Sequence, residues 1–342
     1  MSTVYFTSTL SLSTPKGIAV DPVLKQVLIS DSGNNKVVLC TLDGLKQVTT
    51  KSSYNSNNFS SPNGITYYNG YFYICDTGSH TVVRLRARDL AYKGVFGVYG
   101  SSGSATTKLS SPAGITHDKK YLYITNGGSN IITKLNLENL TYNSNTSSIN
   151  GAFNAPTGIV YKKEGGEALF IADKVGNRIV KCQTDFTYIE QNSTNITSPL
   201  GLTYIRDMVH VCNGGSGDDD IIVLASDGLA SQTALTDTAI TLSTPDGIAS
   251  YKDSIFVCDS GNNRVTVWRA YNPRDSFTPA TPMKFGGVTG NNPMMIVGKD
   301  TVVVGATQEY GTPNRWKEEN TNNYGLGAVE EDTVSSSWTE ES

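Results

Sequence analysis

The sequence lacks long hydrophobic runs. No apolar stretch reaches the ~18 residues of a membrane-spanning helix, and the opening segment MSTVYFTSTLSLSTPKG has neither the basic nor the apolar part of a secretory signal. We therefore expect no membrane partner, no secretory signal, and a location in the cytoplasm or in a virion.

Paired cysteines and histidine-rich motifs are also absent. The five Cys stand singly inside apolar runs with no Cys-x-x-Cys, which favours buried, reduced thiols over disulfides. There are only three His, and no HExxH, GxSxG, Walker or GxGxxG motif occurs. The sequence thus predicts no catalytic residue, no metal site and no cofactor.

What the sequence contains instead is a six-fold internal repeat, with a period of 43–50 residues. Each copy opens with Pro-x-Gly and an apolar residue, at Pro15, Pro62, Pro112, Pro156, Pro199 and Pro245. A β-rich run follows and ends in an acidic or amide residue: Asp31, Asp76, Asn126, Asp173, Asn213 or Asp259. A turn and a second β-rich run complete the copy, so each repeat predicts several short strands.

The β-rich runs have apolar residues at both parities, as in YFYICD (71–76). Antiparallel strands buried on both faces are typical of the blades of a β-propeller, where each blade packs between two neighbours. The octets SDSGNNKV (30–37) and CDSGNNRV (258–265) then form hairpins. We predict that the six acidic or amide residues are structural, with carboxylates bonded to backbone N–H groups of their own or adjacent hairpins.

The repeat resembles the NHL repeat of β-propeller proteins. The segments that carry the resemblance are PKGIAVD…LISDSGNNKVVLC (15–40) and PDGIASYKDSIFVCDSGNNRVTVW (245–268), within a region spanning about residues 12–270. The resemblance implies an all-β propeller with four-stranded blades. It implies no single function, because similar propellers serve as protein-binding modules, RNA-binding modules, lyases and lactonases.

Seven blades are favoured over six with a C-terminal extension. Residues 293–323 align as a degenerate seventh copy, and TVYFTST (3–9) occupies the position of an outer strand that closes the ring with the last blade. The predicted domains are a propeller at 1–327 and an acidic polar tail at 328–342. In that tail, Trp338 is a candidate contact with another chain, and an idle solubilising tail is the alternative.

The predicted function is that of a non-catalytic interaction or structural propeller. The first strands contain only His117 as a ligand for a metal in the channel, which argues against a metal-dependent lyase or lactonase. The run Asp218–Asp220 is interpreted as a solvated turn and not as a calcium site. Without the tail, the sequence keeps 26 of its 31 acidic residues and all 27 basic residues. The basic residues are scattered along the repeats and form no patch, which disfavours RNA binding. We expect a protein-binding subunit of a larger assembly, such as a viral or phage particle, with glycan as a possible ligand and no nucleic acid.

Overall fold

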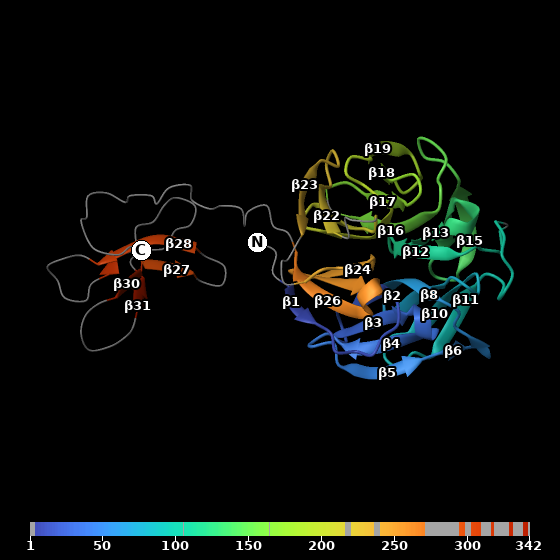
Figure 1. The fold of residues 1–342 in the computed structure, drawn as a ribbon, viewed down its shortest axis with the longest axis horizontal. Coiled ribbons are helices and arrows are strands. Elements are labelled where there is room, and N and C mark those ends of the chain that lie inside the picture. The colour runs from blue at the N-terminus through green and yellow to red at the C-terminus, as the bar shows by residue number, and fades with distance from the viewer. Residues whose placement is uncertain are drawn as a thin grey trace. The chain divides into compact units, whose positions relative to one another are not determined.

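The computed structural model describes residues 4–270, except 105, 164, 216–219 and 236–239, followed by the strand segments 294–297, 302–308, 316–317, 328–330 and 338–340. The chain forms two compact units, Met1–Asn272 and Pro273–Ser342. The first unit is a propeller of six four-stranded antiparallel sheets, arranged as blades around a centre (Figure 1). No helix in the described part of the chain is long and apolar enough to cross a membrane.

Each blade uses one copy of the repeat. The innermost strands are β2 (Pro15–Asp21), β8 (Pro62–Tyr68), β12 (Pro112–His117), β16 (Pro156–Lys162), β20 (Pro199–Ile205) and β24 (Pro245–Tyr251). The second strands are β3 (Gln26–Asp31), β9 (Tyr71–Asp76), β13 (Tyr121–Asn126), β17 (Ala168–Asp173), β21 (Met208–Asn213) and β25 (Ser254–Asp259). The third strands are β4 (Lys36–Thr41), β10 (Thr81–Arg86), β14 (Ile131–Asn136), β18 (Arg178–Cys182), β22 (Asp220–Ala225) and β26 (Arg264–Arg269). The outer strands are β5 (Gln47–Lys51), β11 (Tyr92–Phe96), β15 (Thr141–Thr146), β19 (Tyr188–Asn192), β23 (Ser231–Leu235) and β1 (Val4–Thr7).

The middle strands are buried on both faces, as their apolar runs predict. In β9, Phe72 and Ile74 pack in one hydrophobic cluster, while Tyr73 and Cys75 pack in another, and all four are at most 1% exposed. The two clusters lie on opposite faces of the blade because successive strand residues point to opposite sides. The five cysteines are all buried and free of disulfides, which confirms that prediction.

The ring has six blades, so the prediction of seven is wrong. The first strand, β1, pairs with β26 and supplies the outer strand of the sixth blade, with Val4 opposite Trp268 and Thr7 opposite Thr266. The inner strand of that sixth blade, β24, contacts β2 of the first blade. A seventh blade would have to separate these two strands, and their direct contact leaves no place for it.

The second unit contains a sheet of its own, in the order β27 (Met294–Val297), β28 (Val302–Gln308), β29 (Trp316–Lys317), β30 (Ala328–Glu330) and β31 (Trp338–Glu340). Residues 293–323 therefore belong to this unit and not to a blade. The sequence-based boundary at 327/328 lies within the same unit. The side chain of Trp338 lies outside the described part of the structure, and its contact with another chain stays a prediction.

Candidate functional site

The six acidic or amide residues at the ends of the second strands form the same hydrogen bond in every blade. Each side-chain Oδ1 accepts a bond of 2.6–2.7 Å from a backbone N–H two residues before the Pro that opens the blade. The acceptors are Asp31, Asp76, Asn126, Asp173, Asn213 and Asp259, and the donors are Ser13, Ser60, Ser110, Asn154, Thr197 and Ser243. The partner is thus the loop before the first strand and not the hairpin itself. All six acceptors are at most 2% exposed, so these bonds lie in the interior of the propeller.

A second hydrogen bond links five of the hairpins to the next blade. Asn35 Oδ1 accepts from the Ser61 N–H at 2.8 Å, and Asn263 Oδ1 accepts from the Thr14 N–H at 2.7 Å. Both asparagines adopt left-handed backbone conformations, with φ of 49° and 55°, which asparagine tolerates better than most residues. The bond from Asn263 joins the sixth blade to the first. The recurrence of SDSGNNKV and CDSGNNRV therefore follows from two hydrogen bonds, one within the blade and one between blades.

The Gly of each Pro-x-Gly lies where the blades approach most closely at the centre of the ring. A Cβ on Gly17 would lie 2.0 Å from the Asn63 carbonyl oxygen, and one on Gly247 would lie 2.1 Å from the Lys16 oxygen. The same contact, at 2.1–2.3 Å, recurs at Gly64, Gly114, Gly158 and Gly201. Because no side chain fits at these distances, glycine is required here by a close approach between backbones and not by a bend.

The residue between Pro and Gly borders a cavity at the centre of the ring. This position is Lys16, Asn63, Ala113, Thr157, Leu200 and Asp246 in the six blades. Together with the glycines, the following apolar residues and Lys174, they line a cavity of about 150 Å³, here called the channel mouth. One sequence position per blade thus determines most of the chemistry of the mouth.

The charged residues of the channel mouth are Lys16, Lys174 and Asp246. Lys174 comes from the hairpin after β17, at a position where most blades have a small residue. In the first and sixth blades that residue is Ser32 or Ser260, whose hydroxyl donates to the carbonyl of the next blade's Pro. Lysine at this position adds a second ammonium group to the mouth.

Burial raises the pKa of Asp246 to about 6, and the nearby Lys16 and Lys174 ammonium groups lower it only in part. Neither lysine forms an ion pair with this carboxylate among the described residues. A carboxyl group with such a pKa changes charge near neutral pH and can accept or release a proton there. The mouth therefore combines two cations with one titratable acid.

The three histidines lie elsewhere. His80 replaces the hairpin asparagine, and its Nδ1 accepts the Ser111 N–H at 3.0 Å. His117 Nε2 lies 3.0 Å from the Tyr67 carbonyl oxygen, and burial lowers the pKa of its ring. His210 is fully buried, and burial lowers its pKa to about 4, as expected for a core position.

Among the described residues, no cluster of three or more His, Cys, Asp or Glu side chains is placed to hold a metal ion. Two members of the predicted turn Asp218–Asp220, residues 218 and 219, lie outside the described part of the chain.

Several basic side chains join neighbouring blades. At one position of the third strand, Arg84, Lys134 and Lys181 each donate to a backbone carbonyl in the next blade, at 2.8–3.0 Å. We call these contacts the cation bridges. Their acceptors are the carbonyl oxygens of Glu138, Thr184 and Ser226.

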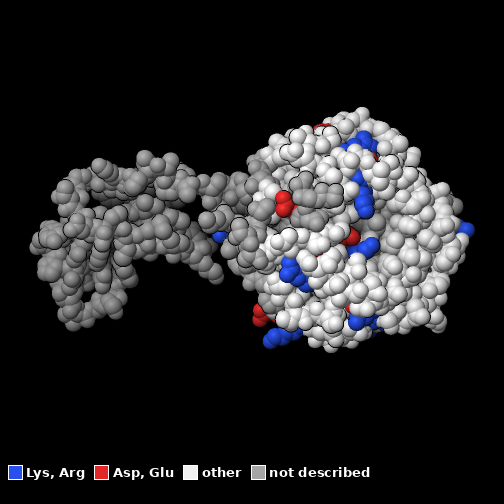
Figure 2. Space-filling view, viewed as in Figure 1, with Lys and Arg blue, Asp and Glu red and all other residues white. Residues whose placement is uncertain are grey.

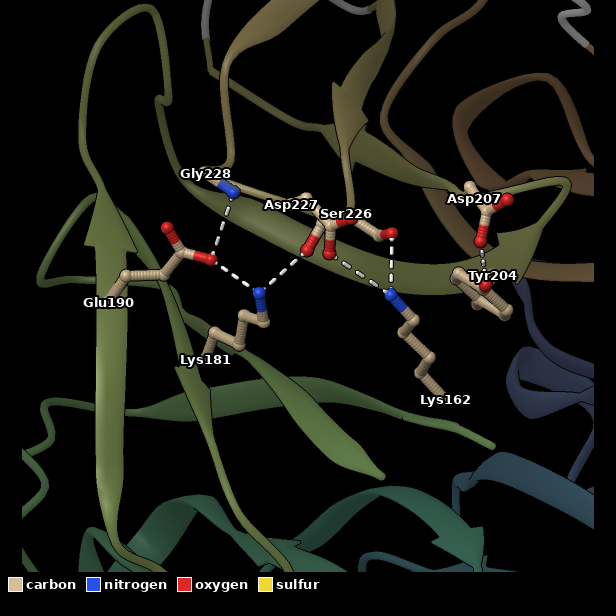
Figure 3. A network of polar contacts seen from close by, with 8 residues as sticks. All are labelled: Lys162, Lys181, Glu190, Tyr204, Asp207, Ser226, Asp227 and Gly228. Carbon is tan, nitrogen blue, oxygen red and sulfur yellow. Dashed lines mark hydrogen bonds and ion pairs between the residues drawn. The ribbon is translucent and has the colours of Figure 1, made fainter. Parts of the chain in front are cut away.

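The bridge between the fourth and fifth blades is the most extensive (Figure 3). Lys181 also bonds Glu190, and Lys162, which is 2% exposed, donates to Ser226 Oγ at 2.9 Å and to Asp227 at 3.3 Å. On the sequence alone, the basic residues were only seen to be scattered along the repeats, and this role was missed. Elsewhere, the face of the propeller shown in Figure 2 has only scattered charged side chains.

Comparisons with known proteins show the fold. No family model and no curated protein matches the chain, so the NHL resemblance stays a prediction. A streptogramin B lyase structure is similar, with a TM-score of 0.53 and 15% identity over 79% of this chain and 98% of the other. A catalytically inactive histidine-to-alanine variant of virginiamycin B lyase from Staphylococcus aureus, with quinupristin, gives a TM-score of 0.55 and 15% identity over 79% and 100%. The Cps50 (Swd1) β-propeller domain of Myceliophteria thermophila gives 0.56 and 8% identity, also over 79% and 100%.

These similarities correct one prediction. From its sequence the chain was predicted not to be an enzyme, yet structures that it resembles are lyases, so its fold is one that carries enzymes. The absence of a recognised motif was a poor guide because residues far apart in the sequence, from all six blades, meet at the channel mouth.

Sequence reasoning also missed Lys16, Lys174 and Asp246. A signal was present for Lys16 and Asp246, because the residue after each Pro reads Lys, Asn, Ala, Thr, Leu and Asp in turn, while the Pro and Gly around it never change. Variation at one position of an otherwise constant motif indicates that the fold does not determine that residue. Such a position is free to serve binding.

Proposed function

We propose that the propeller is an interaction module that binds an anionic group of a partner, a carboxylate of a partner protein, in the channel mouth. The observation that supports the proposal is the placement of two ammonium groups, Lys16 and Lys174, in one cavity with a single carboxylate. With Asp246 ionised, these three groups have a net charge of +1.

Electrostatics makes this placement effective. Two opposite unit charges ~4 Å apart attract by ~1 kcal/mol in bulk water but by ~4 kcal/mol at an effective dielectric constant of ~20. Each ammonium group also offers three donors to a carboxylate. Because Asp246 pairs closely with neither lysine, the donors of both remain available to a ligand.

The size of the channel mouth favours a protein group over a large cofactor. Its volume is about 150 Å³, whereas sites for drug-sized molecules have ~300–1,000 Å³. The mouth therefore admits a group the size of an acidic side chain or a chain terminus. The hydrogen bonds between blades hold the six lining strands in place, so little ordering is needed on binding.

Titration calorimetry with short peptides tests the proposal. A peptide with a free C-terminal Glu should bind, and the double variant Lys16→Gln, Lys174→Gln should lose about tenfold or more in affinity. Lys46→Gln, at an exposed turn, is the matched control and should bind like the wild type. Free glutarate distinguishes a small-molecule ligand from a peptide. Equal binding by the double variant and the wild type would contradict the proposal.

A second candidate is proton-transfer catalysis at the same mouth, and the observation that favours it is the raised pKa of Asp246. The inactive variant of the S. aureus lyase lacks a histidine, whereas none of the described histidines lines the mouth of this chain. Asp246 would then be the group that transfers the proton.

Incubation with quinupristin, followed by chromatography of the intact compound, tests this second candidate. Loss of the compound with the wild type but not with Asp246→Asn supports catalysis. No loss with either protein excludes this substrate.

A further inference from the structure

We infer that the channel mouth is an acid-dependent anion site, in which the negative charge of Asp246 opposes binding of the anion to Lys16 and Lys174 until Asp246 takes up a proton. The inference rests on the proposed function and adds its regulation. It follows from three groups that line one cavity, two of them cations and one an acid.

The position of Asp246 lets its charge oppose an anionic ligand. Its carboxylate is the acidic group among the residues that line the channel mouth, and it has the sign of the ligand. When it is ionised, it neutralises one of the two positive charges and repels an incoming anion. When it is protonated, both positive charges are available, and the carboxyl group becomes a hydrogen-bond donor to the ligand.

Among the described residues, the surroundings of Asp246 contain no second group that would reverse this effect. On the neighbouring inner strand and the β17–β18 hairpin, the charged groups near it are Lys16 and Lys174. Nearby on β21 and β25 lie Cys212 and Cys258, and burial raises the pKa of both thiols, so they stay neutral.

The remaining neighbour is Asp259, whose oxygens accept bonds from the Ser243 N–H and from Arg264. These partners keep it in the interior of the blade, away from the channel mouth. Asp246 is therefore the group whose proton changes the charge of the cavity. The pKa of this group, about 6, places the change at mildly acidic pH.

The sign of the effect follows from linkage. An anion favours the protonated form of Asp246, so a proton favours the anion by the same factor. Affinity should be highest below pH ~6 and should fall as the pH rises through that value. Coupling between two sites typically amounts to 5–150-fold, and we expect a loss of about tenfold or more between pH ~5 and pH ~8.

Sulfate is the probe, because its charge does not change over this range. Calorimetric titrations at pH ~5 and pH ~8 should show the loss of affinity for the wild type. At neutral pH, the observed enthalpy of sulfate binding should depend on the ionisation enthalpy of the buffer, because the buffer supplies the proton that Asp246 takes up. Asp246→Asn should bind with equal affinity at both pH values and without proton uptake. Asp43→Asn, at an exposed turn, is the matched control and should behave like the wild type.

A second variant keeps the test valid if Asp246→Asn fails to fold. Lys174→Gln removes one cation that stabilises the ionised carboxylate, so the midpoint of the pH dependence should move upward. Sulfate binding that is equal at both pH values in the wild type would overturn the acid dependence and leave the proposed function standing. No sulfate binding by the wild type or by Asp246→Asn at either pH would overturn both.

Discussion

Replacing Gly247 by alanine tests whether close contact between backbones closes the ring. The added Cβ would lie 2.1 Å from the Lys16 carbonyl oxygen, 2.8 Å from its carbon and 3.0 Å from the Gly17 Cα. All three atoms are backbone atoms of β2, so no side-chain rotation relieves the overlap. The inner strands of the first and sixth blades must move apart by about 1 Å, because ordinary Cβ contacts lie beyond ~3 Å.

The cost of that movement is estimated from overpacked cores, where extra methyl groups destabilise by ~1–3 kcal/mol. Because the neighbouring atoms belong to the backbone and cannot rotate away, we expect Gly247→Ala to lie at the upper end of this range, at ~3 kcal/mol. Urea unfolding, followed by the fluorescence of the buried Trp268, measures the change. A shift of the midpoint with an unchanged slope would report lost stability rather than an altered unfolded state.

Gly94→Ala is the matched control for this experiment. Gly94 lies in the outer strand β11, where a Cβ would meet only the ends of side chains, the nearest being Leu140 Cδ1 at 3.3 Å. We expect a change within ~0.5 kcal/mol for this variant. If Gly247→Ala were as stable as Gly94→Ala, direct contact between β24 and β2 could not be what closes the ring.

Three further predictions concern stability. Asp259→Ala should destabilise by ~1–3 kcal/mol, because it removes a buried acceptor and leaves the part-buried Ser243 N–H without its partner. Asp253→Ala, at an exposed ion pair, should change the free energy of unfolding by less than ~1 kcal/mol. Equal effects of the two variants would argue against the structural role of Asp259. Asp246→Asn should raise the free energy of unfolding above pH ~6 and leave it unchanged below pH ~4. The pKa of Asp246 is higher in the folded than in the unfolded state, so the wild type loses stability as this acid ionises. Melting curves across this range check the sign. Lys181→Met should lower the melting temperature by a few degrees through loss of the bond to the Ser226 carbonyl, and an unchanged value would show that this cation bridge adds nothing.

Much of the propeller could be read from the sequence because its determinants are local. The β-rich run at 71–76 has apolar residues at both parities, and this pattern alone indicates a strand buried on both faces. Asp and Asn in the hairpins were recognised as structural for a local reason as well, since they favour turns and their side chains bond backbone N–H groups. The six copies of the Pro-x-Gly motif then gave the number of complete repeats.

The sequence by itself therefore determined the strands, the hairpins and the order of the blades. Only the tertiary structure decided that the sixth blade lies directly against the first, because this depends on residues far apart in the sequence, such as Gly247 and Lys16, which are 231 positions apart. The channel mouth was decided in the same way. Lys16, Lys174 and Asp246 belong to three different blades, and the burial that raises the pKa of Asp246 exists only once six inner strands surround a common axis.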